Sequence, residues 1–480
     1  MYKNLDKENI KFTHLILLLA GINLIFLFLT FQNSWLSDDY PYIFGTKLYN
    51  LIQEQNFYFF STQENRFLPI YWFITQFIPP NYNVWIIIVV FVYFLSSIAL
   101  FFLVKELTNN NFIGVLSSIL YSINYSISIK ALSWAVFFGH VFNAFLGFLS
   151  ILIFLKICKK KNKTFLIIFY FFLNLLNFFI TEGALIYPII CLSVHLLFYR
   201  LDLRKVTISI SPIVIYILVV FVYTGKFLPI FTERLDNNRS QQYEKIFNKE
   251  QDSELYFYRS TYAPRNFKGY TLRAFDNLTS SLNISSLEKS LKYFDTENFL
   301  QKEIKKNLKF YISIFIFLFA STIYLLVINF KKVNKKDYIN YLLLYLIIFF
   351  IYTVIFFRKD ISFALSFISS LIISKILYDM IKVKLKIFPV IILVIYSLPT
   401  IIYGSTNFQY FGDFSMKSAR ANYLEYETKI KENNLYKKTT NYNNFKYLFY
   451  FKNYNNYENY LKKYKGHSLR KFYKQFHTNE

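Results

Sequence analysis

Two adjacent carboxylates are the clearest chemical feature of the sequence. They lie in the run Ser37–Tyr40 (SDDY), directly after an apolar stretch near residues 14–32. Adjacent carboxylates raise one another's pKa and desolvation raises it further, so such a pair is costly unless it is solvated, metal-bound or catalytic. Asp38 or Asp39 could act as a general base, and the two together could hold a divalent cation. A solvated helix N-cap formed by Ser37 or Asp38 is the simpler alternative.

The same connection carries a cation and aromatic side chains. It contains the run Asn65–Trp72 (NRFLPIYW). An arginine followed by a proline and amphipathic aromatics is typical of a segment at the depth of lipid head groups. Arg66 could bind phosphate because its planar fork matches phosphate oxygens. Tyr71 and Trp72 could stack on a sugar or a prenyl chain, although such residues are more often interface anchors.

Two later motifs supply further charged groups. Glu182 lies in the run Thr181–Gly183 between two short apolar runs. An ionisable residue in such a place is a functional candidate by default. A loop carboxylate in water would have the same sequence context. Arg358 and Lys359 come just before another apolar run.

These residues must be positioned by long uncharged runs. The 480-residue chain is 55% hydrophobic and only 17% charged. A helix of roughly 18 or more apolar residues can cross a bilayer, because every backbone group bonds within its own segment. We therefore expect an all-α polytopic membrane protein of about eleven spans. The expected spans lie near residues 14–32, 84–104, 112–129, 134–155, 164–181, 184–199, 206–224, 310–330, 338–357, 361–378 and 387–403. The pair at 164–199 is either a tight hairpin or one broken helix.

Basic residues mark every second connection between these runs. The positive-inside rule places those connections in the cytoplasm, so the N-terminus is expected to be cytoplasmic and the C-terminus extracytoplasmic. Much of the formal net charge of +25 then comes from basic residues that set the membrane topology. A nucleic-acid partner, which would require a basic patch on one folded face, is not expected.

The expected organisation is one transmembrane catalytic domain over residues 1–403, with a first outer loop at 33–83 and a large outer loop at 225–309. Residues 404–480 are rich in Tyr, Asn and Lys and are expected to form an extracytoplasmic tail or small domain. The 11 glycines are scattered. They form no Gly-rich phosphate turn, which argues against a soluble nucleotide-binding fold. Asn143, Asn174 and Asn177 are expected to hydrogen-bond between helices.

Together the motifs resemble those of the GT-C glycosyltransferases, which include the protein O-mannosyltransferases and the aminoarabinose transferase of lipid A. The resemblance covers about residues 1–400. It rests on the acidic pair after the first span, the basic-Pro-aromatic segment in the same loop, the run Glu182–Pro188 (EGALIYP), and the late basic position at Arg358. One departure is that the basic segment has a single proline where the family has a double-proline form.

The resemblance implies inverting transfer of a sugar from a polyprenyl-phosphate donor to a hydroxyl of a lipid, glycan or protein acceptor. The protein would lie in the plasma (inner) membrane of a bacterium and act at its outer face. Asp38 would be the general base, Asp39 would orient the acceptor or help hold Mg or Mn, and Glu182 is the next catalytic candidate. The residues implied for the donor phosphate are Arg66, Arg358 and Lys359.

Two other functions remain open. A transporter or flippase of lipid-linked glycans would place charges and Gly/Pro breaks at the bilayer midplane. The runs here are almost free of charge, and the carboxylates collect at the outer surface. A polymerase or ligase of lipid-linked glycans would be expected to use outer-loop Arg and His instead of an acidic pair.

Overall fold

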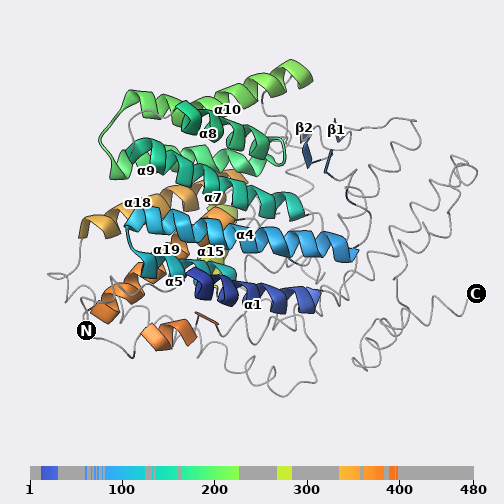
Figure 1. Ribbon diagram of the computed structural model, residues 1–480. Coiled ribbons are helices and arrows are strands. Elements are labelled where there is room, and N and C mark those ends of the chain that lie inside the picture. Colours follow the sequence, from blue (N-terminus) through green and yellow to red (C-terminus); the bar gives the residue numbers. More distant parts are fainter. Residues whose placement is uncertain are drawn as a thin grey trace, which may run out of the picture.

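Nearly all the described residues are helical in the computed structural model of the protein (Figure 1). The described residues are 12–30, 60–61, 66–67, 70–71, 73–74, 78, 82–124, 132, 137–159, 164–225, 227, 267–283, 335–356, 362–382, 387, 389–394 and 396–397. Within them, 5 helices are long and apolar enough to cross a membrane, by length and composition. This part of the chain confirms the expected class, an all-α membrane protein. The number of spans stays a prediction.

Most of the long helices lie side by side with roughly aligned axes (Figure 1). They are α1 (Phe12–Thr30), α4 (Tyr82–Thr108), α5 (Asn111–Ser122), α7 (Phe138–Lys159), α8 (Thr164–Phe178), α9 (Ile186–Phe198), α10 (Leu203–Thr224), α18 (Lys335–Ile351) and α19 (Phe363–Lys382). The other elements are the 3₁₀ helix η4 (Glu182–Leu185), the π-helix η6 (Tyr352–Phe356), the helix α15 (Phe267–Ser281) and the strands β1 (Phe60–Ser61) and β2 (Arg66–Phe67).

The described helices follow the predicted runs, and the exception is the run at 112–129. The run at 112–129 forms a helix only as far as Ser122, so α5 has 12 residues. Its length of about 18 Å is well short of a hydrocarbon core of about 30 Å. The run at 164–199 is two separate helices, because the backbone at Thr181 is extended and ends the helical path. The predicted span at 310–330 lies outside the described residues.

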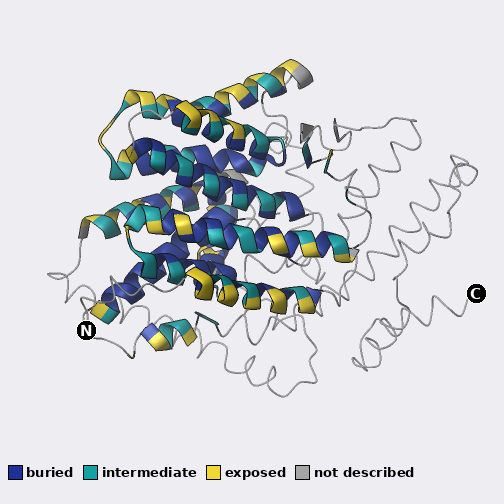
Figure 2. Cartoon of the chain, in the orientation of Figure 1, coloured by how far each residue is buried: buried dark blue, intermediate teal, exposed yellow. Residues whose placement is uncertain are grey.

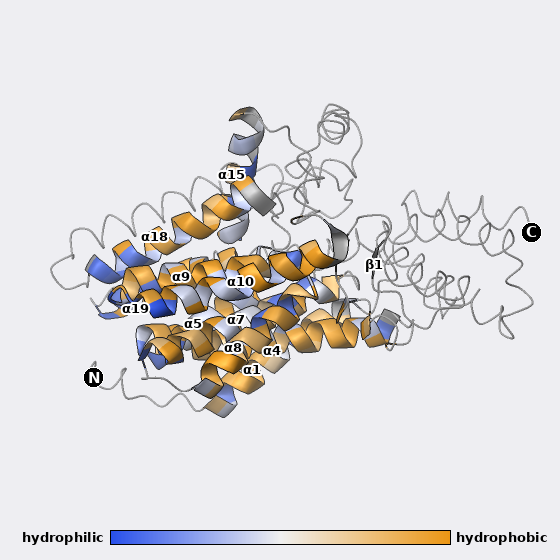
Figure 3. Cartoon of the chain, turned by 90° about the horizontal axis from the view of Figure 1, so that it is seen from above, coloured by the Kyte–Doolittle hydropathy of each residue, from blue (hydrophilic) through white to orange (hydrophobic). Residues whose placement is uncertain are grey.

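Helices α7 and α19 form the inside of the bundle, whereas α1, α8 and α10 each expose a face (Figure 2). Helix α7 packs against α4, α8 and α9, and α19 packs against α5 and α18. The exposed faces are themselves apolar, as Figure 3 shows, and include Phe28, Phe172 and Val222. Soluble proteins rarely expose large apolar patches, so these faces suit contact with lipid.

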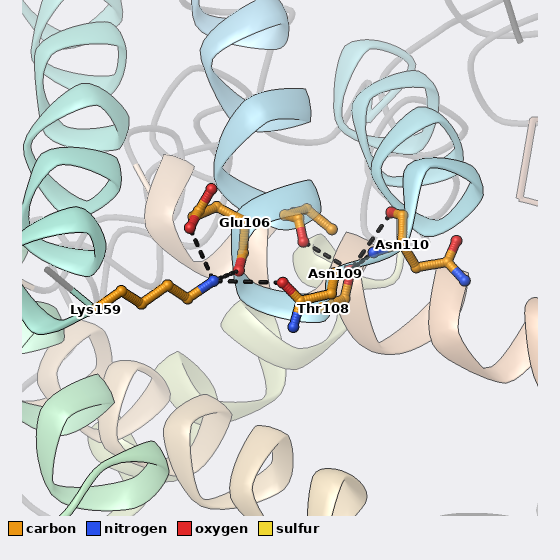
Figure 4. Close-up of polar contacts among 6 residues, drawn as sticks. Glu106, Thr108, Asn109, Asn110 and Lys159 are labelled. Atoms are coloured by element: carbon orange, nitrogen blue, oxygen red, sulfur yellow. Dashed lines mark hydrogen bonds and ion pairs between the residues drawn. The ribbon is translucent and has the colours of Figure 1, made fainter. Parts of the chain in front are cut away.

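One end of the bundle is held together by the predicted basic connections. Lys159, in the last turn of α7, donates to the carbonyl oxygen of Glu106 at 2.7 Å and pairs with its carboxylate at 2.8 Å (Figure 4). The same ammonium lies 3.4 Å from Oδ1 of Asn109, whose φ of 53° lets the chain reverse between α4 and α5. Asn110 then caps α5 by accepting from the amides of Phe112 and Ile113. We call this the basic end.

A second group of contacts joins further helices at the basic end. Lys205 of α10 donates to the carbonyl of Cys158 in α7 at 3.3 Å and pairs with Asp202 at 3.3 Å. Desolvation raises the pKa of Asp202, but bonds from Lys205 and from backbone amides outweigh it and leave that pKa below its ordinary value. Asn340 of α18 donates to the carbonyl of Leu197 in α9 at 3.0 Å. The basic connections, predicted at every second position along the chain, therefore meet at one end of the bundle.

Candidate functional site

The structure describes only part of the predicted site. Asp38, Asp39, Trp72, Arg358 and Lys359 lie outside the described residues. Arg66 is described through its backbone, which pairs with Ser61 in the antiparallel β1–β2 pair. Tyr71 and Glu182 are described in full, and they lie at the same end of the bundle, opposite the basic end. We call it the loop end.

Tyr71 anchors the first predicted outer loop on the bundle. The amides of Ile70 and Tyr71 donate to the carbonyl of Phe179 at 3.2 and 3.4 Å. This carbonyl directly follows α8, where the last carbonyls have no partner within the helix. The Tyr71 ring is 5% exposed and packs on Gly139 near the start of α7, where an added Cβ would lie 3.0 Å from the ring. Its burial favours positioning of the loop over stacking on a ligand.

Glu182 lies three residues beyond that anchoring carbonyl. Thr181 caps η4 by accepting from the amide of Gly183 at 3.4 Å, so Glu182 occupies the first position of the short helix. A carboxylate there is favoured by the free amides of a helix N-terminus. Glu182 is 8% exposed. The turn therefore keeps Glu182 buried at the loop end, three residues after the carbonyl that binds the docked loop segment.

Two asparagines connect the helices around this turn. Asn177 of α8 donates to the carbonyl of Asn143 in α7 at 3.1 Å, which confirms an interhelical role for that pair. Asn174 instead donates to the carbonyl of Tyr170 in its own helix at 2.8 Å. The amide nitrogen of Asn143 would lie 3.8 Å from a Cβ added at Gly183. We refer to Tyr71, Asn143, Asn177, Glu182 and Gly183 as the loop-end cluster.

A second polar region, not predicted from the sequence, is brought to the bundle by α15. Arg273, Asp276 and Asn277 are 3%, 5% and 2% exposed, although the loop at 225–309 was expected to lie outside the bundle. Asn277 donates to Oγ1 of Thr353 in η6 at 3.2 Å. The chain continues from η6 into the predicted phosphate-binding residues at 358–359. The sequence does carry a signal that could have identified this helix. Its polar residues recur at intervals of three and four, and its phenylalanines lie on the opposite face.

Helices α5 and α15 cap each other through two buried asparagines. Asn124, just after α5, lies 3.4 Å from the carbonyl of Ser280 and 3.5 Å from that of Ser281. Asn283, just after α15, lies 3.5 Å from the carbonyl of Ile123 and donates to that of Tyr396 at 2.8 Å. Each side chain thus reaches carbonyls at the end of the other helix, which explains why α5 stops short of its predicted end.

A buried ion pair was also missed, since the predicted spans were described as almost free of charge. Lys375 Nζ lies 3.0 and 2.9 Å from the two carboxylate oxygens of Asp379, four residues later in α19. The Tyr338 hydroxyl donates to the same carboxylate at 2.7 Å. Lys375 is 8% and Asp379 3% exposed. This pair lies in the half of α19 that approaches the basic end, away from the loop-end cluster.

The described residues hold no group of three or more His, Cys, Asp or Glu side chains suited to a metal. The acidic pair, the predicted place for a cation, lies outside them. No protein-family model, curated protein or solved structure matches the chain, so its function is argued from its own residues.

Proposed function

We propose that the protein is an integral-membrane glycosyltransferase that transfers a sugar from a polyprenyl phosphate to an acceptor hydroxyl at the outer face of the membrane. The proposal keeps the GT-C arrangement of about eleven spans, with the loop end facing outward. The acceptor is a hydroxyl of a lipid, a glycan or a protein.

The observation that supports this function is the bond between the first predicted outer loop and the turn that carries Glu182. The amides of Ile70 and Tyr71 share the Phe179 carbonyl, so two motifs more than one hundred residues apart meet at the loop end. The predicted base, Asp38, belongs to the same loop. A lipid-linked donor lying in the bilayer would reach such an end without a soluble nucleotide-binding domain.

The proposed chemistry needs a base on one side of the sugar and cations on the other. Asp38 takes the proton of the acceptor hydroxyl while that oxygen attacks the anomeric carbon. The bond from this carbon to the phosphate oxygen breaks, and the polyprenyl phosphate leaves with the electron pair, inverting the anomeric centre. Arg66, Arg358 and Lys359 stabilise the negative charge on the leaving phosphate.

A transporter of lipid-linked glycans is the second candidate, because Lys375 and Asp379 are ionised groups within an apolar helix. The pair is closed, with both carboxylate oxygens within 3.0 Å of the ammonium. A substrate pathway at the midplane would instead present charges to a water-filled cavity. We therefore rank transport below transfer.

The test compares Asp38→Asn with Asp202→Asn in purified full-length protein supplied with labelled polyprenyl-phosphate sugars. Loss of the base should lower turnover by about 100-fold or more. Asp202 is the N-cap of α10 at the basic end. Asn caps helices as well as Asp does, so Asp202→Asn should keep both fold and activity. Equal turnover by wild type and Asp38→Asn would refute the base assignment. Flux of labelled lipid-linked sugar across proteoliposomes without any transfer would instead support the transporter.

A further inference from the structure

Helix α15 is polar on the side that faces the protein and apolar on the side that faces away. Among the residues of α15 whose side chains the structure describes, the exposed ones are Phe267 at 88%, Phe275 at 54% and Leu278 at 43%, together with Thr271. These positions follow intervals of three and four and therefore share one face of the helix. A surface helix in water shows the opposite arrangement, with the apolar stripe on the core and the charges in solvent.

The buried face explains why the helix is oriented this way. Arg273 lies over the ring of Tyr270, with its Cζ 5.2 Å from the ring centroid, and is only 3% exposed. Asn277 bonds to Thr353, and Ser281 Oγ lies 3.0 Å from the Tyr345 hydroxyl of α18. These polar groups of α15 are therefore placed against the Tyr345 hydroxyl of α18 and Thr353 of η6, which leaves the phenylalanines outside.

Helix α15 is fixed to a helix whose own exposed side is suited to lipid. Helix α18 is a candidate span, and it exposes Leu342, Leu346 and Phe350 at intervals of four residues. Figure 3 shows α15 beside α18, steeply inclined to it, at the end away from the basic connections. Contacts from Ser281 and Asn277 fix α15 to this end of α18.

We propose that α15 is an interfacial helix whose face formed by Phe267, Thr271, Phe275 and Leu278 lies in the bilayer, at the boundary between head groups and acyl chains. An amphipathic helix at that depth buries its apolar face by about 5–10 Å and keeps its polar face away from the chains. Here the polar face is turned to the protein, so the bilayer presses Arg273 and Asp276 against the bundle. Contact with the bilayer thereby stabilises the packing of α15 against the loop end. This inference does not depend on the proposed reaction.

The test measures which medium contacts the exposed face. Thr271→Cys and Phe275→Cys are made in the full-length protein, labelled with a small fluorophore and placed in lipid nanodiscs. Wild type serves as the labelling blank, because its only cysteines, Cys158 and Cys191, are both buried. Quenching by nitroxide lipids carrying the spin label near the head group, or near the chain end, is compared with quenching by iodide in water.

We expect both positions to lose more emission with the shallow nitroxide lipid than with the deep one or with iodide. Two reference positions calibrate the scale: Phe172→Cys, exposed in the middle of the span α8, and Arg204→Cys, exposed at the basic end. Strong iodide quenching without lipid quenching would overturn the proposal, because the face would then lie in water. Protection from all quenchers would also overturn it, because protein would cover the face. Thr271→Cys is the milder change and keeps the test valid if Phe275→Cys does not fold.

Discussion

Gly147 determines how closely α7 and α9 approach each other. A Cβ added at this position would overlap the ring of Tyr187, which is fully buried on α9. Small residues allow such close contact between membrane helices. Tyr187 also packs edge-on against Phe148, the next residue of α7. Neither partner can move away without disturbing the centre of the bundle.

We therefore expect Gly147→Ala to lower stability and Gly21→Ala to preserve it. Overpacking costs about 1–3 kcal/mol, which exceeds the gain of about 1 kcal/mol from helix propensity. Gly21 in α1 is the matched control, because a Cβ there meets nothing within 4 Å. Thermal unfolding of the purified proteins in detergent measures both effects. If the two variants melt together, the contact between Gly147 and Tyr187 does not limit packing.

Lys375 and Asp379 each depend on the other to compensate a buried charge. Their side chains are 10% and 5% exposed, and the carboxylate also accepts from Tyr338. Removal of one member leaves an uncompensated buried charge, at a cost of about 3–5 kcal/mol. We expect Lys375→Met and Asp379→Leu to be strongly destabilised as single variants. The double variant should recover most of the loss, apart from the unpaired Tyr338 hydroxyl. A double variant whose loss of stability equals the sum of the two single losses would mean that the two charges act independently.

The junction between α5 and α15 depends on one residue in an unusual conformation. Asn283 has a φ of 61°. Glycine adopts such a conformation freely, whereas it costs other residues about 1–2 kcal/mol. The Asn283 side chain also contacts the carbonyls of Ile123 and Tyr396. Asn283→Gly keeps the backbone and loses the contacts, whereas Asn283→Ala loses the contacts and strains the backbone.

We expect faster hydrogen exchange across α15 in Asn283→Gly and a further loss of stability in Asn283→Ala. The loss of a side-chain hydrogen bond is worth about 1 kcal/mol, and the second variant adds the backbone cost. Asn109, with a φ of 53° at the basic end, is the matched control: its substitution should leave exchange in α15 unchanged. Equal exchange in wild type and Asn283→Gly would show that the asparagine contacts do not hold α15 in place.

The sequence predicts some elements well because nothing interrupts their apolar runs. The limits of α1, α4, α10 and α19 agree with the predictions to within four residues, since local hydrophobicity alone decides them. The end of α5 was not predictable, because the Ile123 carbonyl that directly follows it is contacted by Asn283, 160 residues away. The inward polar face of α15 was missed for the same reason. Which face of a helix is buried depends on the elements that pack against it, and those elements lie far away in the sequence.

The candidate site likewise has parts that the local sequence predicts and parts that depend on distant contacts. The sequence identified Tyr71 and Glu182 individually by residue type, but not the Phe179 carbonyl that brings their segments together. That carbonyl is an ordinary backbone group at the end of a helix, so no residue type marks it. The acidic pair and the late cations stay predictions, because they lie outside the described residues.

At the scale of the whole molecule, the two ends of the bundle differ in chemistry. The basic end ties its connections with lysines, such as Lys159 on Glu106 and Lys205 on Asp202. The described contacts at the loop end are made by asparagines, backbone carbonyls and tyrosines. If the positive-inside rule applies to the whole chain, the basic end faces the cytoplasm and the loop end faces outward.

This assignment predicts opposite accessibility for cysteines at the two ends of the bundle. Tyr40→Cys, beside the acidic pair, should react with a membrane-impermeant thiol reagent on intact cells. Arg204→Cys, exposed between α9 and α10, should react only after lysis. Wild type should remain unlabelled in both conditions, because Cys158 and Cys191 are buried. The reverse pattern would place Asp38 on the cytoplasmic side, where a nucleotide-sugar would be an available donor and the proposed dependence on a lipid-linked sugar would lose its reason. Labelling of both positions on intact cells would mean that the basic connections do not set the topology.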